Sequence, residues 1–223
     1  MKRQGSITAI SKLDEIRHLL ERQAGEAGYI ASSTIKRFEI LRRIDVARVP
    51  YVSEVAARDT PGLSELYAEI TNLRGGVINL YQALANQPAA LRAFMGMSRY
   101  IREESSFDPA LRELAILATG YALDVPYEIH HHLPIARRVG VPHAKLAAFP
   151  GWQESSEFTS VERAVLTYAH AVARRGTVDD ATFGALRQHF GDAEIVELAV
   201  TVAWYHFVAA ILGPLGIEIE DPK

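Results

Sequence analysis

The side chains best suited to chemistry lie in the stretch PYEIHHHLPIA, residues 126–136. It holds three consecutive histidines in a chain with no cysteine, so proton transfer or metal binding would fall to imidazoles and carboxylates. On a helix, Glu128 and His132 lie one turn apart on the same apolar face. His130 and His131 point to the other side, where we expect water or a neighbouring subunit. The candidate pair is therefore Glu128 and His132.

A carboxylate and an imidazole on one buried face must satisfy each other or a third group, because an unpaired buried charge is costly. The pair fits a proton-transfer site, in which burial and mutual contact move both pKa values. It also fits a structural hydrogen bond. A third interpretation is an oxygen and nitrogen ligand set for zinc, iron or manganese, completed by Glu113 and His206. Spacing alone leaves all three open.

The helix expected just before the pair brings a second carboxylate toward it. Asp108-Pro109 is a helix start signal, with the carboxylate as N-cap and the proline in the first turn. Residues 110–123 are apolar on nearly every side, which predicts a central, buried helix. Its two charged residues are Arg112 and Glu113. We expect Glu113 to converge with the pair on one cavity, and Arg112 to serve a surface or subunit contact.

The last helix is the remaining source of candidate site residues. Residues 198–217 contain no formal charge, but Gly213-Pro214 is expected to end the helix. About fifteen apolar positions remain where a membrane span needs about 20, so we predict a core helix and no membrane contact. His206 follows Tyr205 inside it. Its imidazole either bonds a carbonyl or faces the acid/base residues.

The chain as a whole carries helical rather than strand periodicity, which predicts an all-α fold. Residues 1–45 hold two amphipathic patterns around GEAG and are expected to form a helical extension, separate from the domain at 46–223. The helices expected in that domain cover 64–73, 77–86, 89–102, 110–123 and 126–140, and three more begin at the capping box TSVE (159–162), at 177–180 and after Gly191-Asp192.

Composition narrows the class of protein. A chain of 223 residues, 48% apolar with a net charge of -3, can bury a large core but offers no phosphate-neutralising surface. Nucleic acid is therefore not an expected partner. The absence of cysteine excludes disulfides and thiol redox chemistry. Because no secretory signal is recognisable at the start, we expect a cytoplasmic location.

The segment RELAILATGYALDVPYEIHHHLPIARRVGV (112–141) resembles the carboxymuconolactone decarboxylase family, which shares the all-helical AhpD-like fold with alkylhydroperoxidases. The shared pattern is Arg-Glu-Leu, then Tyr-Glu-x-x-x-His, then Ala and Gly at helical spacing. The resemblance extends over roughly 47–219 and leaves 1–45 outside. The matching residues are Arg112, Glu113, Leu114, Tyr127, Glu128, His132, Ala136 and Gly140.

The resemblance implies an AhpD-like helical bundle that assembles as a homo-oligomer, a trimer or hexamer. The redox branch of the fold uses two cysteines, whose positions here are Val125 and Glu128, so thiol peroxidase activity is excluded. The cysteine-free branch implies a pocket that binds a small organic acid or lactone without a cofactor. We therefore expect a decarboxylase-like lyase or isomerase in which His132 delivers a proton, Glu128 holds its tautomer, and Glu113 is a base or relay.

The expected substrate contacts are Tyr205, His206 and, secondarily, Tyr127. Relatives often carry Tyr-Asn-x-x-x-Arg on the last helix, where this chain has Tyr205, His206 and then Ala210. The missing arginine could have clamped a substrate carboxylate, so γ-carboxymuconolactone itself is a doubtful substrate. A scaffold that keeps the pocket and binds a small molecule without turnover is the non-enzymatic alternative.

Overall fold

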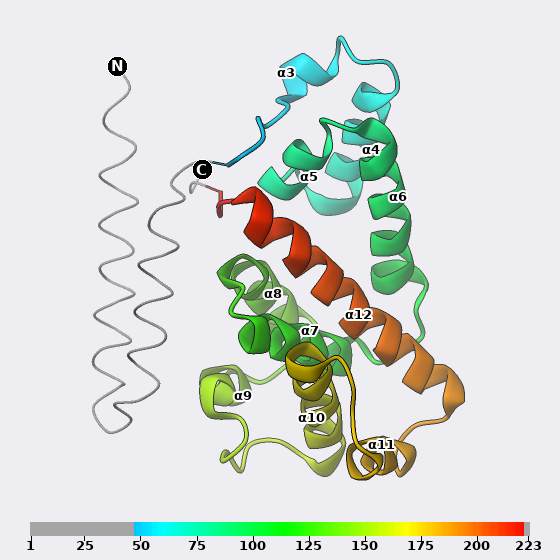
Figure 1. Cartoon of the computed structure of the whole chain (residues 1–223), viewed down its shortest axis with the longest axis vertical. Helices are drawn as coiled ribbons and strands as arrows, with labels where there is room; N and C mark the ends of the chain where they lie inside the picture. Colours follow the sequence, from blue (N-terminus) through cyan, green and yellow to red (C-terminus); the bar gives the residue numbers. More distant parts are fainter. Residues whose placement is uncertain (1–46, 221–223) are drawn as a thin grey trace, which may run out of the picture. The chain divides into compact units, whose positions relative to one another are not determined.

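A computed structural model describes residues 47–220, and the predicted extension at 1–45 lies outside the described residues. Within 47–220 the chain forms α-helices, a π-helix and a 3₁₀ turn and no strand, which confirms the all-α prediction there (Figure 1). The helices are α3 (Glu54–Ala57), α4 (Leu63–Arg74), α5 (Asn79–Leu84), α6 (Pro88–Arg99), α7 (Pro109–Leu123), α8 (Pro126–Arg138), α9 (His143–Ala148), α10 (Ser160–Arg175), α11 (Asp180–Arg187) and α12 (Asp192–Leu215), with the π-helix η1 (Tyr100–Glu104) and the 3₁₀ turn η2 (Phe149–Gly151) between them.

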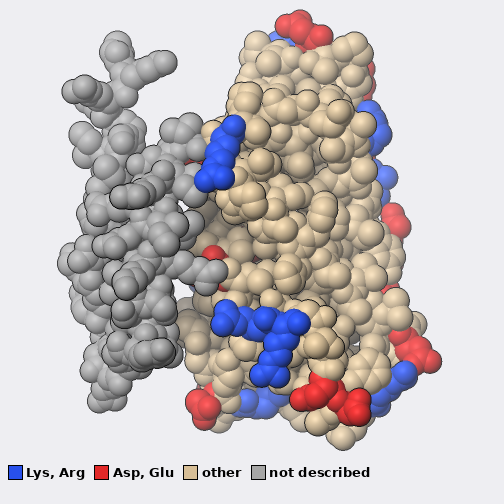
Figure 2. Space-filling model, viewed as in Figure 1, with Lys and Arg blue, Asp and Glu red and all other residues tan. Residues whose placement is uncertain are grey.

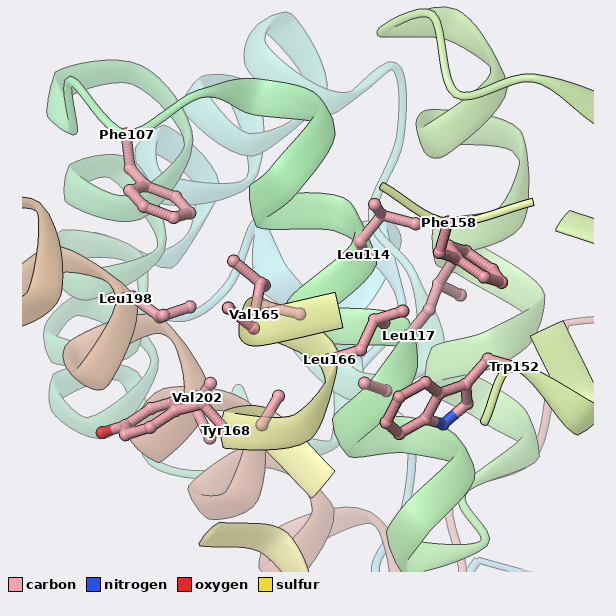
Figure 3. Close-up of a cluster of buried hydrophobic side chains, with 14 of the residues drawn as sticks. Phe107, Leu114, Leu117, Trp152, Phe158, Val165, Leu166, Tyr168, Leu198 and Val202 are labelled. Atoms are coloured by element: carbon pink, nitrogen blue, oxygen red, sulfur yellow. The ribbon is translucent and has the colours of Figure 1, made fainter. Parts of the chain in front are cut away.

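Helix α7 is the central helix of the domain. It begins as predicted, because the Asp108 carboxylate accepts a hydrogen bond of 2.8 Å from the Leu111 amide. All its residues from Arg112 to Gly120 are buried, and it packs against α8, α10 and α12. Figure 3 shows the core that its inner side chains form with those of α10 and α12. Any side chain on α7 therefore meets protein on almost every side.

The turn after α7 folds α8 back along it. Asp124 adopts a left-handed conformation (φ 57°), and the Val125 amide donates to the Gly120 carbonyl at 2.9 Å. Gly120 also permits the close approach of the two helices, because a β-carbon there would lie 3.5 Å from the β-carbon of Glu128 and 3.4 Å from Ile129. This packing places the Glu128 end of α8 directly against α7.

Helix α12 contributes to both large buried clusters of the domain, one formed with α7 and α10 and the other with α4 to α6 (Figure 1). Leu198 and Val202 pack with α7 and α10, whereas Val208 and Leu212 pack with α4 to α6. The predicted end at Gly213-Pro214 is wrong. Proline in the last turn does not stop the helix there, and left-handed Gly216 (φ 62°) ends it.

The outer face of α12 is apolar. Val196 is 58% exposed and Phe207 50%, and charged side chains are sparse in the middle of this face of the molecule (Figure 2). By length and composition, α12 is the one helix in 47–220 that could cross a membrane. That is weak evidence, because the core helix of a soluble protein meets the same criteria.

Candidate active site

The structure brings the three predicted acid/base side chains together between α7 and α8. The Nδ1 atom of His132 lies 2.7 Å from Oε2 of Glu113, and its Nε2 atom lies 3.3 Å from Oε2 of Glu128. His132 is 1% exposed, Glu113 2% and Glu128 5%. Each ring nitrogen thus faces a different carboxyl group in a site that excludes water.

A fourth residue, Arg102, completes the cluster, although it is not among the residues predicted from the sequence. It comes from η1, and its Nη2 atom lies 3.3 Å from Nε2 of His132 and 3.3 Å from the Tyr205 hydroxyl. Whereas Tyr205 and the three predicted residues are buried, Arg102 is partly exposed. The available signal was charge balance, because two buried carboxyl groups call for a cation close to them.

The contacts fix which atoms carry protons. A guanidinium can only donate, so Nε2 of His132 accepts from Arg102 and the ring proton lies on Nδ1. That proton is donated to the Glu113 carboxylate at 2.7 Å. Burial raises the pKa of Glu128 despite the opposing influence of His132 and Arg102, so its neutral acid is more favoured than that of an exposed glutamate. In its protonated form, Glu128 can be a second donor toward Nε2.

The electrostatics keep Arg102 charged and Tyr205 neutral. Burial alone would lower the pKa of Arg102, but its interactions with Tyr205, Glu113 and Glu128 raise it overall. Burial raises the pKa of the Tyr205 phenol. The Tyr205 ring meets the imidazole edge to face, with centroids 4.8 Å apart. The site therefore holds one cation, one carboxylate and three neutral groups that can donate or accept protons.

Two of the predicted substrate contacts lie apart from this cluster. Tyr127 is buried among residues of α4 to α6, where its hydroxyl donates to Glu220 at 2.7 Å and accepts from the Leu80 amide at 3.3 Å. His206 is partly buried and makes no hydrogen bond or ion pair with any residue in 47–220. Of the three expected contacts, only Tyr205 reaches the acid/base residues.

The C-terminal segment is held against the far side of α8. The Glu220 carboxylate lies 2.8 Å from Nε2 of His131 and accepts from Tyr127 and from the Asn79 amide, both at 2.7 Å. Although burial alone would raise the pKa of Glu220, these hydrogen bonds lower it to about 2. His131 thus contacts the C-terminal segment through Glu220. It is adjacent in sequence to His132.

Replacing Glu220 with glutamine is expected to lower the free energy of unfolding by about 1 kcal/mol at pH 7; the carboxylate is partly exposed, so screening reduces the gain. Because its pKa is depressed in the folded state, this stabilisation exists above its ordinary value of 4.5 and is lost as the pH falls toward 2. Urea unfolding of both proteins at pH 7 and pH 3 measures the difference. A loss that is equally large at both values would contradict the assignment.

Of the two contacts expected for Arg112, the surface contact is wrong for the described chain, and the subunit contact stays a prediction. Arg112 is 7% exposed, its Nε atom has no hydrogen-bond partner, and it forms no ion pair with any residue in 47–220. One turn along α7, Ile116 packs with Ile101 and Tyr205. The residues of η1 and α12 therefore cover the side of α7 that the helical wheel left open.

Replacing Arg112 with methionine is expected to raise the free energy of unfolding by about 1–2 kcal/mol, because it removes an unpaired buried charge and keeps the apolar stem. Chemical denaturation of the two proteins tests this. Arg163→Met is the matched control, since Arg163 donates to the Gln153 carbonyl at 3.1 Å, and that variant should lose about 1 kcal/mol. Equal destabilisation by both changes would show that Arg112 has a partner.

The side chains do not form a metal site. Within 47–220 no group of three or more His, Cys, Asp and Glu side chains is arranged to hold a metal ion. Nδ1 of His132 is engaged by Glu113, and Nε2 faces the Arg102 guanidinium at 3.3 Å. A cation at Nε2 would have to displace this arginine, so the donor set does not fit the zinc, iron or manganese alternative.

Comparison with solved structures defines the fold. A peroxidase-related protein from Ralstonia eutropha JMP134, described as an alkylhydroperoxidase AhpD core, is 22% identical, with a TM-score of 0.67 over 79% of this chain and 93% of that chain. A cysteine-to-alanine variant of the debrominase Bmp8, in complex with 2,3,4-tribromopyrrole, is also 22% identical, with a TM-score of 0.65 over 73% and 88%. A peroxidase-related protein from Silicibacter sp. TM1040 is 16% identical, with a TM-score of 0.65 over 77% and 92%. At these identities the likeness shows the AhpD-like fold alone.

A family model matches the segment of the chain that contains the site. Residues 88–171 match the carboxymuconolactone decarboxylase family, which confirms the resemblance seen in the sequence. The matched segment contains Arg102, Glu113, Glu128 and His132, and it belongs to a chain without cysteine. No curated protein matches the chain.

Proposed function

We propose that this protein is a cofactor-free acid/base enzyme, a lyase or isomerase, that acts on a small carboxylated or lactone-type molecule. One observation chiefly supports the proposal: a buried imidazole held by Glu113 at 2.7 Å presents its unprotonated nitrogen to both an acid and a cation. A base, a proton donor and an anion-stabilising group are the components that such chemistry requires.

Each side chain has a distinct role in the proposed reaction. The Glu113 carboxylate holds His132 in the tautomer whose Nε2 atom is the base, a part that the sequence analysis gave to Glu128. Glu128, whose pKa is raised by burial, is the acid. Arg102 and the Tyr205 hydroxyl stabilise negative charge that develops on a carbonyl oxygen.

In a decarboxylation, the bond from carbon to the carboxylate would break and carbon dioxide would leave. The electron pair would pass to the adjacent carbonyl, forming an enolate beside Arg102, and Glu128 would supply the proton that the carbon then takes. In an isomerisation, Nε2 of His132 would remove the proton and Glu128 would return one elsewhere.

Turnover of a panel of small lactones and carboxylic acids by the purified protein tests the proposal. His132→Ala and Glu113→Gln should each lower kcat/KM by about 10²–10⁴-fold. His143→Ala, which removes an exposed histidine from α9, is the control and should keep full activity. Full activity in both site variants would rule out the proposed chemistry.

A second candidate is a binding protein without turnover, and the near-complete burial of Glu113, Glu128 and His132 favours it. Such a protein would show ligand-dependent thermal shifts with the same panel but no product. Self-association as a trimer or hexamer and a cytoplasmic location stay predictions.

A further inference from the structure

We propose that Arg102 is a carboxylate receptor that covers the base in the free protein, and that a substrate monocarboxylate uncovers Nε2 of His132 by taking over the arginine. The inference rests on the proposed function of the site and deepens it. It names the part of the substrate that is recognised, and it links recognition to activation of the base.

The first observation is that Arg102 is a cation whose hydrogen-bond partners are neutral. Its Nη2 atom donates to His132 and to Tyr205, and Arg102 forms no ion pair with a carboxylate in 47–220. Other arginines of the domain do pair with carboxylates, such as Arg99 with Glu69 and Arg74 with Glu103. A guanidinium has five N–H donors, so Arg102 keeps capacity for a carboxylate.

The second observation concerns the base. Nε2 of His132 has one lone pair, and two groups lie at the same 3.3 Å from it, the Arg102 guanidinium and the Glu128 carboxyl group. A lone pair that accepts from a guanidinium is not open to a substrate proton. An anion that draws Arg102 away would remove the charged donor from Nε2 and leave Glu128 beside it as the acid.

The third observation is the backbone that carries Arg102. In η1 the Ser105 amide donates to the Tyr100 carbonyl at 2.8 Å, five residues back. The wide turn lets two consecutive side chains face inward, since Ile101 packs on Tyr205 and Arg102 bonds to it. Single π-turns are rare and concentrate at functional sites. This one positions the arginine of the site.

The charges of the site also determine how many carboxylate groups a ligand should carry. The Glu113 carboxylate stays in the cluster as the partner of His132, and Arg102 is the group that can balance one further negative charge. A second carboxylate on the ligand would enter a buried site without a counter-ion. The site should therefore prefer a monocarboxylate to a dicarboxylate of similar size, and either to a neutral amide.

Binding of benzoate, phthalate and benzamide tests the proposal without any turnover, by calorimetry and thermal shift. Benzoate should bind the wild-type protein at least 10-fold more tightly than phthalate or benzamide. Arg102→Gln should weaken benzoate binding at least 10-fold, and Arg102→Lys should weaken it less. Arg92→Gln, which removes an exposed arginine from α6, should have no effect.

Nitrogen-15 spectra of histidine-labelled protein follow the base directly, with the His132 signal assigned by its loss in His132→Ala. Benzoate should shift the Nε2 resonance of His132, and Arg102→Gln should shift it in the absence of any ligand. Arg102→Lys serves both measurements if the glutamine variant does not fold.

Three results would overturn the inference: no benzoate binding by the wild-type protein, benzoate binding that the Arg102 variants do not weaken, or an Nε2 resonance that benzoate leaves in place. The proposed function can fail separately. Arg102-dependent binding with no turnover of any substrate would support the receptor and reject the enzyme, whereas turnover with binding independent of Arg102 would do the reverse.

Discussion

Replacing Glu113 with alanine is expected to lower the free energy of unfolding by about 3 kcal/mol. Glu113 is almost fully buried and accepts a 2.7 Å hydrogen bond from Nδ1 of His132. Its charge also stabilises the Arg102 guanidinium. The alanine variant would leave a buried N–H donor without its acceptor and would remove a charge that stabilises Arg102. Urea unfolding at pH 7 measures the loss.

Three further variants distinguish the effect of losing the Glu113–His132 hydrogen bond from the effect of losing side-chain volume. Glu113→Gln keeps an acceptor oxygen and should lose less than the alanine variant. His132→Ala and the double variant complete a mutant cycle, in which we expect a coupling energy of about 1–3 kcal/mol. Glu157→Ala, an exposed acid, should change stability by less than about 0.5 kcal/mol. A loss below about 1 kcal/mol for Glu113→Ala would contradict the contact.

Replacing Glu128 with glutamine is expected to remove a pH dependence and to reduce activity. Burial raises the pKa of Glu128 in the folded protein, so the folded state retains a proton that the unfolded state releases. Its contribution to stability is then full below the ordinary value of 4.5 and is lost as the pH rises through the raised folded pKa. Glutamine, which cannot ionise, should be more stable than wild type at pH 7 and level with it at pH 4.

The same substitution tests the role of the acid. Glutamine cannot release a proton, so turnover should fall by about 10²-fold or more. In the wild-type protein, activity should decline as the pH rises and Glu128 ionises, and the residual activity of the variant should lack that alkaline limb. Unfolding curves at both pH values and a kcat/KM profile measure these effects. A variant that is less stable than wild type at pH 7 would show that Glu128 is ionised in the folded protein.

The sequence by itself determined the local elements and one face of the site. Helix starts at Asp108 and Thr159 follow from short-range capping contacts, and both form as predicted. Glu128 and His132 share a face because an α-helix returns to the same side after four residues. The all-apolar surroundings of Glu113 likewise follow from the composition of α7 alone.

Only the tertiary structure decided which groups the site contains and what each does. Arg102 lies 30 residues from His132 in sequence and 103 from Tyr205, and no local pattern encodes such a contact. A helical wheel also gave Arg112 a surface or subunit contact, since a wheel describes a single helix and cannot show which neighbours cover it. The division of the two imidazole nitrogens between Glu113 and Glu128 depended on the separation of α7 and α8, which Gly120 sets through contacts between helices.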